Sequence, residues 1–313
     1  MTATIVAPVE RGAIDVTGQD RASYLHAVLT QDVEALDPGR WAGALHLDAR
    51  GRPLAVVDVV VLTDRIVLLT QDSDAARELA DTLGSRTFLA DARFAARDVA
   101  ALAVRGPRTH DIAADAGVEV ASSVAAEVGD VVVVAGQQRL DAVGQPDAVT
   151  ALRQRLTAAG AEPADAAAVD AWRVQHGIPG WAREIVAPHL PEEMGLLPTH
   201  VHLDKGCYPG QEAVARMWML GRPRRRLARV RLEGQADAGW TTGAGRAAAQ
   251  VTSATTTPDG DRVGLAYVPA TAQPGDRYGD DDAAVVVRDL VGAELPVPGQ
   301  DPAVARRRDR RAG

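Results

Sequence analysis

The octamer at residues 205–212 reads Lys-Gly-Cys-Tyr-Pro-Gly-Gln-Glu and contains Cys207, the only cysteine among 313 residues. Pro209-Gly210 suits the two central positions of a type II turn, because glycine tolerates the positive φ of the second position. Residues 211–219 read Gln-Glu-Ala-Val-Ala-Arg-Met-Trp-Met, most of which are good helix formers. The octamer therefore predicts a turn and a short helix directly after the cysteine.

Cys207 is the candidate reactive group of this stretch. The N-terminus of a helix carries a partial positive charge, and the ammonium of Lys205 lies two residues away in sequence. Both favour the thiolate over the thiol. The alternative is that Cys207 is a small buried apolar residue, as most free cysteines are, and that Lys205 faces water. The octamer's residue types alone leave both interpretations open.

Length and composition indicate a globular chain of about two domains, since 46% apolar residues suffice for a core. No apolar run approaches the roughly 20 residues of a membrane span, and the first residues lack a basic segment followed by an apolar one. We therefore expect a cytoplasmic protein with no membrane contact. A single cysteine excludes an internal disulfide and a four-thiolate iron–sulfur cluster, so any cluster belongs to a partner.

Strands and helices alternate up to about residue 220. Residues 54–62 form a long β-branched run, and residues 65–70 return as a hairpin partner. Apolar periodicity predicts a helix through residues 76–83 that stops at Gly84, and a capping box at residues 17–20 predicts another that carries Leu25 and Leu29. A strand at residues 131–135 and a helix through residues 149–156 that ends at Gly160 complete this alternation.

The pattern changes near residue 222, where short β runs broken by glycine replace helical periodicity. These runs lie at residues 227–232, 246–254, 264–268 and 283–287. Short strands separated by turn residues predict a small antiparallel barrel, with a domain border near residue 222.

The octamer and its flanks resemble the Lys-Gly-Cys-Tyr-x-Gly-Gln-Glu signature of the YgfZ family of folate-binding proteins, relatives of the glycine-cleavage T-protein, an aminomethyltransferase. His202-Leu203-Asp204 before it and residues 213–216 after it follow the same pattern, and Glu212 and Arg216 are spaced for a helix-surface ion pair. The resemblance implies an α+β fold, in which T-protein-like folate-binding lobes precede a small C-terminal antiparallel β-barrel. It also implies tetrahydrofolate as cofactor, iron–sulfur client proteins as partners, and a role in their assembly or maintenance.

This resemblance extends to residues 24–33, 44–52 and Asp58. Asp58 falls where the T-protein has the second of two aspartates, which assists aminomethyl transfer, and Val57 replaces the first. A carboxylate within an apolar strand is costly unless it is paired or faces a cleft. The alternative is a strand-edge aspartate that points to water.

Residues 172–180 resemble the family's Arg-x-Glu-x-Gly-Ile-Pro segment, with Arg173 at its first position. Gln175 stands where the T-protein has a glutamate that reads the pterin ring. An amide has one accepting oxygen where a carboxylate has two, so the exchange weakens pterin binding by about 1 to 3 kcal/mol. Glu184 matches the acidic position that follows and is the expected compensating carboxylate.

Two arginine clusters stand out against a net charge of −8 and a pI near 5.4, which argue against nucleic acid as the main ligand. The clusters comprise Arg222, Arg224, Arg225, Arg226, Arg229 and Arg231, and, in the tail, Arg306, Arg307, Arg308, Arg310 and Arg311. In the first cluster, Arg229 and Arg231 alternate as on a strand with a solvated face. Alternatively, these guanidiniums meet the carboxylates of a folate tail.

These observations predict three regions: a T-protein-like folate-binding α+β domain of two lobes at residues 1–221, a β-barrel at residues 222–300 and an Arg-rich, disordered tail at residues 301–313. The predicted catalytic residues are Cys207, Lys205 and Asp58. The predicted cofactor-binding residues are Gln175, Arg173, Glu184, Tyr208, Gln211 and Glu212.

No metal site is predicted, because His200, His202 and Cys207 lie too close in sequence to form more than a weak ligand set. Two other functions stay open beside the folate-binding iron–sulfur role. The first is a folate-dependent aminomethyltransferase or other one-carbon transferase, which needs no cysteine. The second is a non-catalytic binding or scaffold protein, whose association would depend strongly on salt.

Overall fold

The computed structural model describes residues 3–220, 223–242 and 248–293. The chain divides into two compact units that are each discontinuous in sequence. Unit 1 comprises Met1–His46, Ala55–Asp170 and Asp204–Tyr208, and unit 2 comprises Leu47–Leu54, Ala171–Leu203 and Pro209–Gly313. The octamer thus contributes residues to both units. The predicted domain borders near residues 222 and 300 and the arginine-rich tail fall on residues outside the described ranges and stay predictions.

Unit 1 is built from two sheets. The six-stranded sheet contains, in spatial order, β11 (Glu162–Pro163), β1 (Ile5–Val9), β7 (Ala100–Arg105), β10 (Arg139–Gly144), β9 (Val131–Ala135) and β8 (Ala125–Val128). The five-stranded sheet contains β3 (Trp41–Leu47), β4 (Pro53–Val61), β5 (Ile66–Thr70), β2 (Gly12–Thr17) and β6 (Arg93–Arg97). The predicted strand pair is confirmed, because β4 and β5 are antiparallel neighbours.

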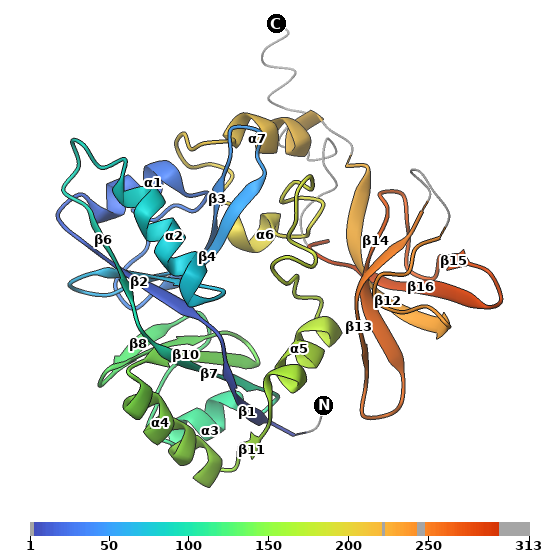
Figure 1. Cartoon of the computed structure of the whole chain (residues 1–313), viewed down its shortest axis with the longest axis horizontal. Helices are drawn as coiled ribbons and strands as arrows, with labels where there is room; N and C mark the ends of the chain where they lie inside the picture. Colours follow the sequence, from blue (N-terminus) through green and yellow to red (C-terminus); the bar gives the residue numbers. More distant parts are fainter. Residues whose placement is uncertain (1–2, 221–222, 243–247, 294–313) are drawn as a thin grey trace, which may run out of the picture. The chain divides into compact units, whose positions relative to one another are not determined.

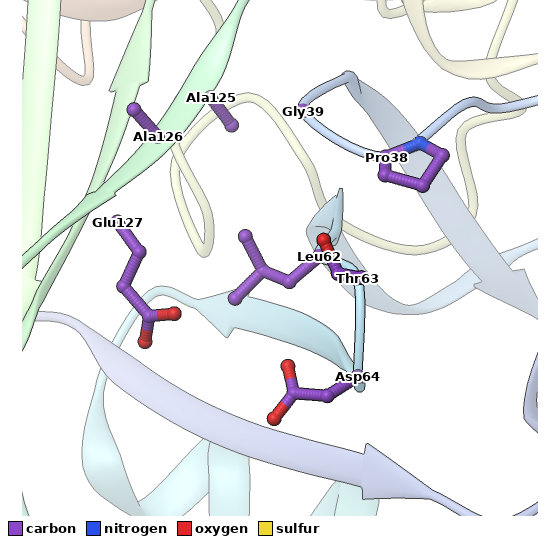
Figure 2. A pocket seen from close by; sticks show the side chains of 8 residues that line it. All are labelled: Pro38, Gly39, Leu62, Thr63, Asp64, Ala125, Ala126 and Glu127. Carbon is purple, nitrogen blue, oxygen red and sulfur yellow. The ribbon is translucent and has the colours of Figure 1, made fainter.

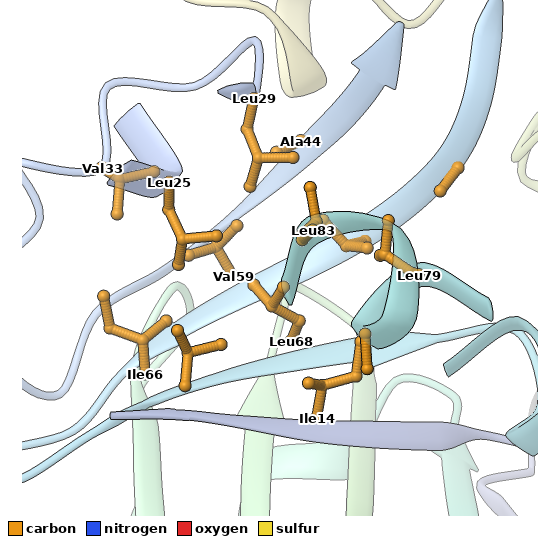
Figure 3. Close-up of a cluster of buried hydrophobic side chains, with 14 of the residues drawn as sticks. Ile14, Leu25, Leu29, Val33, Ala44, Val59, Ile66, Leu68, Leu79 and Leu83 are labelled. Atoms are coloured by element: carbon orange, nitrogen blue, oxygen red, sulfur yellow. The ribbon is translucent and has the colours of Figure 1, made fainter. Parts of the chain in front are cut away.

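Helices cover the outer face of each sheet in unit 1. Helices α1 (Arg21–Val28) and α2 (Ser73–Gly84) pack on the five-stranded sheet, and α3 (Thr109–Asp115) and α4 (Pro146–Ala158) pack on the six-stranded one (Figure 1). Figure 3 shows this contact for α2, whose leucines lie against strand residues such as Leu68. The apolar spacing that predicted α2 and α4 therefore marks the faces that they bury.

The inner faces of the two sheets form a separate apolar layer. Val60 of β4 and Leu69 of β5 share it with Val132, Val134 and Val143 of the six-stranded sheet. Strand β4 is consequently buried on both faces, which explains its nearly continuous apolar sequence. Since successive side chains alternate between faces, Asp58 points into the layer between the sheets.

Two details of the helix predictions were wrong. Asp20, and not Thr17, precedes α1, and its side chain does not cap the helix because Oδ2 accepts a hydrogen bond from the backbone N–H of Asp91 at 2.8 Å. Leu29 lies just beyond α1, although it is fully buried. Helix α2 ends at Gly84 as predicted, but Ser85 occupies its C-cap position.

Unit 2 holds an antiparallel sheet and three helices that connect to it in sequence. The sheet has the order β13 (Gln250–Thr256), β14 (Arg262–Pro269), β12 (Arg225–Gly234), β16 (Ala283–Leu290) and β15 (Arg277–Gly279). The helices are the second half of α5 (Ala166–Gln175), whose residues up to Asp170 belong to unit 1, and the whole of α6 (Leu197–His200) and α7 (Gln211–Leu220). The four predicted β runs correspond to β12, β13, β14 and β16, while residues 246 and 247 of the second run lie outside the described residues. Closure of this sheet into a barrel stays a prediction.

The turn of the octamer packs against the hairpin turn between β3 and β4, within unit 2. Gly210 has φ +81°, the value that a type II turn requires, and a Cβ built on it would lie 2.4 Å from the carbonyl oxygen of Asp48. Asp48 shapes the hairpin turn, because its Oδ1 accepts hydrogen bonds from the backbone N–H groups of Arg50 and Arg52. Gly210 is therefore required both by its backbone conformation and by the close approach of the two turns.

We expect Gly210→Ala to lower the free energy of unfolding by about 2 to 4 kcal/mol, because steric overlap of the new Cβ adds to the cost of a positive φ. Gly239→Ala is the matched control, because Gly239 has φ +86° but no atom within 4 Å of its built Cβ. The control variant should lose only about 1 kcal/mol. Urea denaturation of both variants measures the difference, and equal losses would contradict the close approach at Gly210.

Candidate functional site

Lys205 anchors the N-terminal half of the octamer within unit 1. The side chain is 6% exposed, and its ammonium donates hydrogen bonds to the backbone carbonyls of His26 and of Leu29, the latter at 2.6 Å. These carbonyls lie at the C-terminal end of α1, where unsatisfied acceptors and the helix dipole both favour a cation. The alternative in which Lys205 faces water is therefore wrong.

Lys205 is the only lysine in a chain that contains 33 arginines. Its Nζ also lies 5.0 Å from the ring centroid of Tyr208, which is 8% exposed. Burial is the main cause that lowers the pKa of Lys205, to about 8, against the opposing charges of Asp32 and Glu34. A compact ammonium with three donors fits two carbonyls and a ring face, whereas a guanidinium fork does not.

Cys207 is exposed, so the interpretation as a buried apolar residue is wrong. Helix α7 begins at Gln211, four residues after it, as predicted. The contacts of Lys205 direct its ammonium to the end of α1. Its predicted support of a Cys207 thiolate, and the chemical role of the thiol, stay predictions.

Asp58 takes part in a buried charge cluster between the two sheets of unit 1. Its Oδ2 accepts a hydrogen bond from Arg11 Nη2 at 2.5 Å, and its Oδ1 lies 3.7 Å from Arg139 Nη2. Arg139 in turn lies over the ring of Trp41 at 4.9 Å. Asp58 is 9% exposed on an inner strand, so the alternative of a strand-edge aspartate facing water is wrong.

The second carboxylate of this cluster is Asp141 of β10, which was not identified from the sequence. Its Oδ1 accepts a hydrogen bond from Arg105 Nη2 at 2.6 Å. Burial raises the pKa of Asp141, but Arg105, Arg139 and Arg11 outweigh it and lower that pKa to about 2. The guanidiniums of Arg11, Arg105 and Arg139 thus surround the two carboxylates of Asp58 and Asp141.

Arg173 and Glu184, predicted to bind the cofactor, form one buried network in unit 2. Arg173 Nη1 donates to Glu184 Oε2 at 2.8 Å, and Ser253 Oγ donates to Glu184 Oε1 at 2.6 Å. The backbone N–H of Gly180 also donates to Oε2, and Glu184 has no exposed surface. Both oxygens of Glu184 are therefore occupied by donors of the protein itself.

Gln175, Gln211 and Glu212 lie in less enclosed positions of unit 2. Gln175 ends α5 half-buried, and its backbone carbonyl accepts a hydrogen bond from Arg229 Nη1 at 2.9 Å. Gln211 and Glu212 open α7, and the predicted ion pair of Glu212 with Arg216 is confirmed at 2.6 Å. Whether any of these residues binds a cofactor stays a prediction.

The first arginine cluster forms ion pairs along β12. Arg229 holds both carboxylate oxygens of Asp289, at 2.7 and 2.5 Å, and Arg231 lies 2.8 Å from Glu233. Val230 and Leu232, which alternate with these arginines, are buried, so the predicted strand alternation is confirmed. Arg222 and the tail arginines lie outside the described residues, and binding of a folate tail by this cluster stays a prediction.

Glu192 of unit 2 is a buried acid that the sequence pattern did not single out. It is 8% exposed, and neither carboxylate oxygen has a hydrogen-bond partner in the described part of the chain. Burial raises the pKa of Glu192 to about 8, despite the positive charge of Arg226 and with a further contribution from Glu193. Only its position beside a second glutamate in Pro-Glu-Glu-Met could have drawn attention to it.

Unit 1 also has a surface pocket (Figure 2). Its volume is about 330 Å³, and its lining includes Pro38, Leu62, Asp64 and Glu127. None of the predicted site residues lines this pocket. Within the described ranges, no group of three His, Cys, Asp or Glu side chains is arranged to hold a metal ion, and no helix is long and apolar enough to cross a membrane.

Comparisons with known proteins identify distant relatives, while no protein-family model matches the chain. A chloroplastic Arabidopsis thaliana protein with a provisional transferase name is 25% identical over 281 residues, which cover 82% of this chain and 63% of the relative. The tRNA-modifying protein YgfZ of Vibrio vulnificus is 29% identical over 223 residues, which cover 70% of this chain and 67% of the relative. An aminomethyltransferase of Rubrobacter xylanophilus is 28% identical over 291 residues, which cover 84% of this chain and 75% of the relative. The chain thus spans less than two thirds of the plant relative.

The crystal structure of the glycine cleavage system aminomethyltransferase T from Bartonella henselae has a similar fold. The TM-score is 0.81 at 21% identity, with 95% of this chain and 88% of that chain covered. This likeness concerns the fold, and it confirms the predicted mixed α+β architecture of the T-protein kind.

Because Lys205 is the only lysine, lysine labelled with ¹³C at Cε gives one side-chain signal, and its titration tests the burial of the ammonium directly. We expect a midpoint near the lowered pKa of about 8 in the folded protein. The same signal in urea-unfolded protein should titrate near the ordinary value of about 10.4. A folded-state midpoint at that ordinary value would contradict the buried contact with α1.

Glu192→Gln should change how stability depends on pH. The folded-state pKa of Glu192 is raised to about 8, so its protonated form favours folding at low pH and this contribution is lost as pH rises through that pKa. Relative to wild type, Glu192→Gln should therefore gain free energy of unfolding between pH 5 and pH 8.5. Glu212→Gln, at an exposed position, is the control, and parallel pH profiles for wild type and Glu192→Gln would exclude the raised pKa.

Proposed function

We propose, on the premise that this chain is a distant homologue of the YgfZ proteins and of the glycine-cleavage aminomethyltransferase, that it is a tetrahydrofolate-binding protein that assists assembly or maintenance of iron–sulfur enzymes. Cys207 is its functional thiol. The observation that carries the proposal is the octamer: its lysine is buried against α1 while the adjoining cysteine is exposed. A signature kept for packing alone does not require an exposed thiol.

The fold supports a folate ligand. A chain that matches aminomethyltransferase T over 95% of its length has kept the framework of a protein whose family uses tetrahydrofolate. The ligand's chemistry is to carry one-carbon units on its ring and side-chain nitrogens. The protein has to supply carboxylates or carbonyls for the donors of the pterin ring, and cations for the glutamate tail.

The carboxylates of unit 2 differ in whether their oxygens are already hydrogen-bonded or are available to the pterin donors. Glu184 cannot compensate for Gln175 by direct contact without giving up its hydrogen bonds with Arg173 and Ser253. Glu192, in the same unit, has two buried carboxylate oxygens that form no hydrogen bond with any described residue. We therefore assign Glu192, rather than Glu184, as the acid for the pterin; because its pKa is raised to about 8, it accepts the pterin donors in its ionised form, which binding has to favour. Arg173 and Glu184 are assigned as the residues that hold the loop at residues 178–184 in place.

The aminomethyltransferase alternative is supported by the fold but opposed by the state of Asp58. An aspartate that assists transfer has to approach the reacting nitrogen, and Asp58 is held by Arg11 at 2.5 Å. The partner aspartate is replaced by Val57, which is buried. An exposed cysteine also has no role in that reaction. The thiol-dependent function, by contrast, gives the exposed Cys207 a role.

A calorimetric titration of the full chain with tetrahydrofolate under reducing conditions tests the proposed ligand. We expect saturable binding, and a dissociation constant raised about tenfold in Glu192→Gln, corresponding to ~1.4 kcal/mol. Glu193→Gln is the neighbouring control, because the Glu193 carboxylate is engaged by the backbone N–H of Leu190 and lies 3.4 Å from His189 Nδ1. No saturable binding by wild type would refute the folate assignment, and equal weakening in both variants would refute the role of Glu192.

Cys207→Ser separates the ligand from the thiol function. The variant should bind tetrahydrofolate as wild type does. In cells that lack the protein, wild type should restore the activity of a four-iron cluster dehydratase, whereas Cys207→Ser should leave it at the level of the deletion. Full restoration by Cys207→Ser would remove the thiol from the proposal and favour the scaffold alternative.

A further inference from the structure

The thiol segment of unit 1 lies against an imidazole that the sequence pattern did not assign. A Cβ built on Gly206, the residue before Cys207, would lie 3.6 Å from Nε2 of His26. Cys207 itself is exposed. The outer nitrogen of His26 therefore borders the short backbone segment that carries the only thiol of the chain.

The other ring nitrogen of His26 faces two carboxylates. Nδ1 lies 3.0 Å from Asp32 Oδ1 and 3.8 Å from Glu34 Oε2, and the His26 side chain is 18% exposed. Nδ1 of His26 forms no hydrogen bond within the described residues, despite its 3.0 Å approach to Asp32. Catalytic hydrogen bonds in ligand-free proteins are often poorly formed in this way. An adjacent carboxylate orients an imidazole and stabilises its protonated form.

Asp32 is itself held in place by the turn that follows α1. Its Oδ1 accepts a hydrogen bond from the backbone N–H of Ala35 at 3.2 Å, and its own backbone N–H donates to Gln31 Oε1 at 3.0 Å. Gln31 Nε2 then donates to the carbonyl of Gly43 in β3. The carboxylate that faces His26 is thus tied to the five-stranded sheet.

Lys205 couples the two segments. Its ammonium donates to the backbone carbonyl of His26, the residue whose ring borders the thiol segment, and to that of Leu29. The backbone of His26 is therefore held against the thiol segment by a contact two residues from Cys207. Lys205 acts as a positioning residue here.

We propose that Cys207, His26 and Asp32 form a thiol-activating set, in which His26 is the base; this deepens the proposed function and depends on its assignment of Cys207. The S–H bond of Cys207 breaks, its electron pair stays on sulfur, and the proton goes to Nε2 of His26. Asp32, with Glu34, stabilises the resulting imidazolium. The thiolate is then a nucleophile for a soft electrophilic carbon or sulfur centre.

Alkylation by iodoacetamide tests this set without folate or a client protein. In this reaction the thiolate forms a C–S bond and displaces iodide. Because the chain has one cysteine, the second-order rate constant belongs to Cys207 alone. The readout is the ratio of the rate constant at pH 7 to that at pH 10, where the thiol is ionised without assistance.

We expect His26→Gln to lower this ratio about tenfold, the effect of one unit of lost thiolate stabilisation. Asp32→Asn should lower it several-fold, because the imidazolium loses its neighbouring charge. His202→Gln is the matched control, since His202 is exposed and close to the cysteine in sequence, and its ratio should equal that of wild type.

A purely structural role of His26 predicts a different result. Loosening of the segment changes the rate constants at both pH values together and leaves their ratio unchanged. Circular dichroism and the single Lys205 signal establish that each variant keeps its fold. An unchanged ratio in folded His26→Gln would overturn the proposal, whether or not the protein binds tetrahydrofolate.

Discussion

The contact of the Lys205 ammonium with the last carbonyls of α1 is the interaction on which the thiol segment depends. A helix ends with carbonyl groups that have no partner within the helix, and burial makes each of them costly unless a donor is supplied. Lys205 supplies donors from a position 176 residues away from Leu29 in sequence. Removing the lysine leaves those carbonyls without a donor, so the place of Cys207 is tied to the stability of α1.

In the layer between the two sheets of unit 1, buried polar groups likewise need partners. Strand β4 is covered on one face by helices and on the other by the second sheet, so any polar side chain there needs partners from elsewhere in the fold. Asp58 meets Arg11, and Asp141 meets Arg105 at 2.6 Å. A buried carboxylate of this kind is tolerated because its guanidinium is present, and it becomes strongly destabilising when that partner is removed. The cluster therefore acts as one structural unit.

Local signals predicted most of the fold, whereas the partners of the site residues could not be predicted. Proline and glycine marked the turn at residues 209 and 210, and β-branched runs marked β4, β5 and β9, because both depend on neighbouring residues. The capping box failed because Asp20 bonds to Asp91, far along the chain. Likewise, Asp58 was conspicuous as a carboxylate in an apolar strand, but its arginines come from other elements, and a single sequence does not show which strands become neighbours.

The lysine of the octamer differs from the other basic residues of the chain in a way that physical chemistry explains. Among 33 arginines, one lysine is present, and it occupies the place where a compact cation fits two carbonyl oxygens and an aromatic face. Arginine would bring five donors and a planar fork into a space built for three donors around one nitrogen. Burial lowers the pKa of this lysine to about 8, while the hydrogen bonds of its ammonium direct the charge to the end of α1.

The predicted catalytic groups differ in whether other groups of the protein already bind them. Asp58 is engaged by a guanidinium, and Lys205 is engaged by backbone carbonyls. Cys207, by contrast, is exposed and follows a glycine whose backbone borders an imidazole. In a fold shared with an aminomethyltransferase, the carboxylate is thus held as structure and the thiol is left accessible. Reactivity then depends on the group that takes the thiol's proton, for which we propose His26, because its Nε2 lies 3.6 Å from a Cβ built on Gly206.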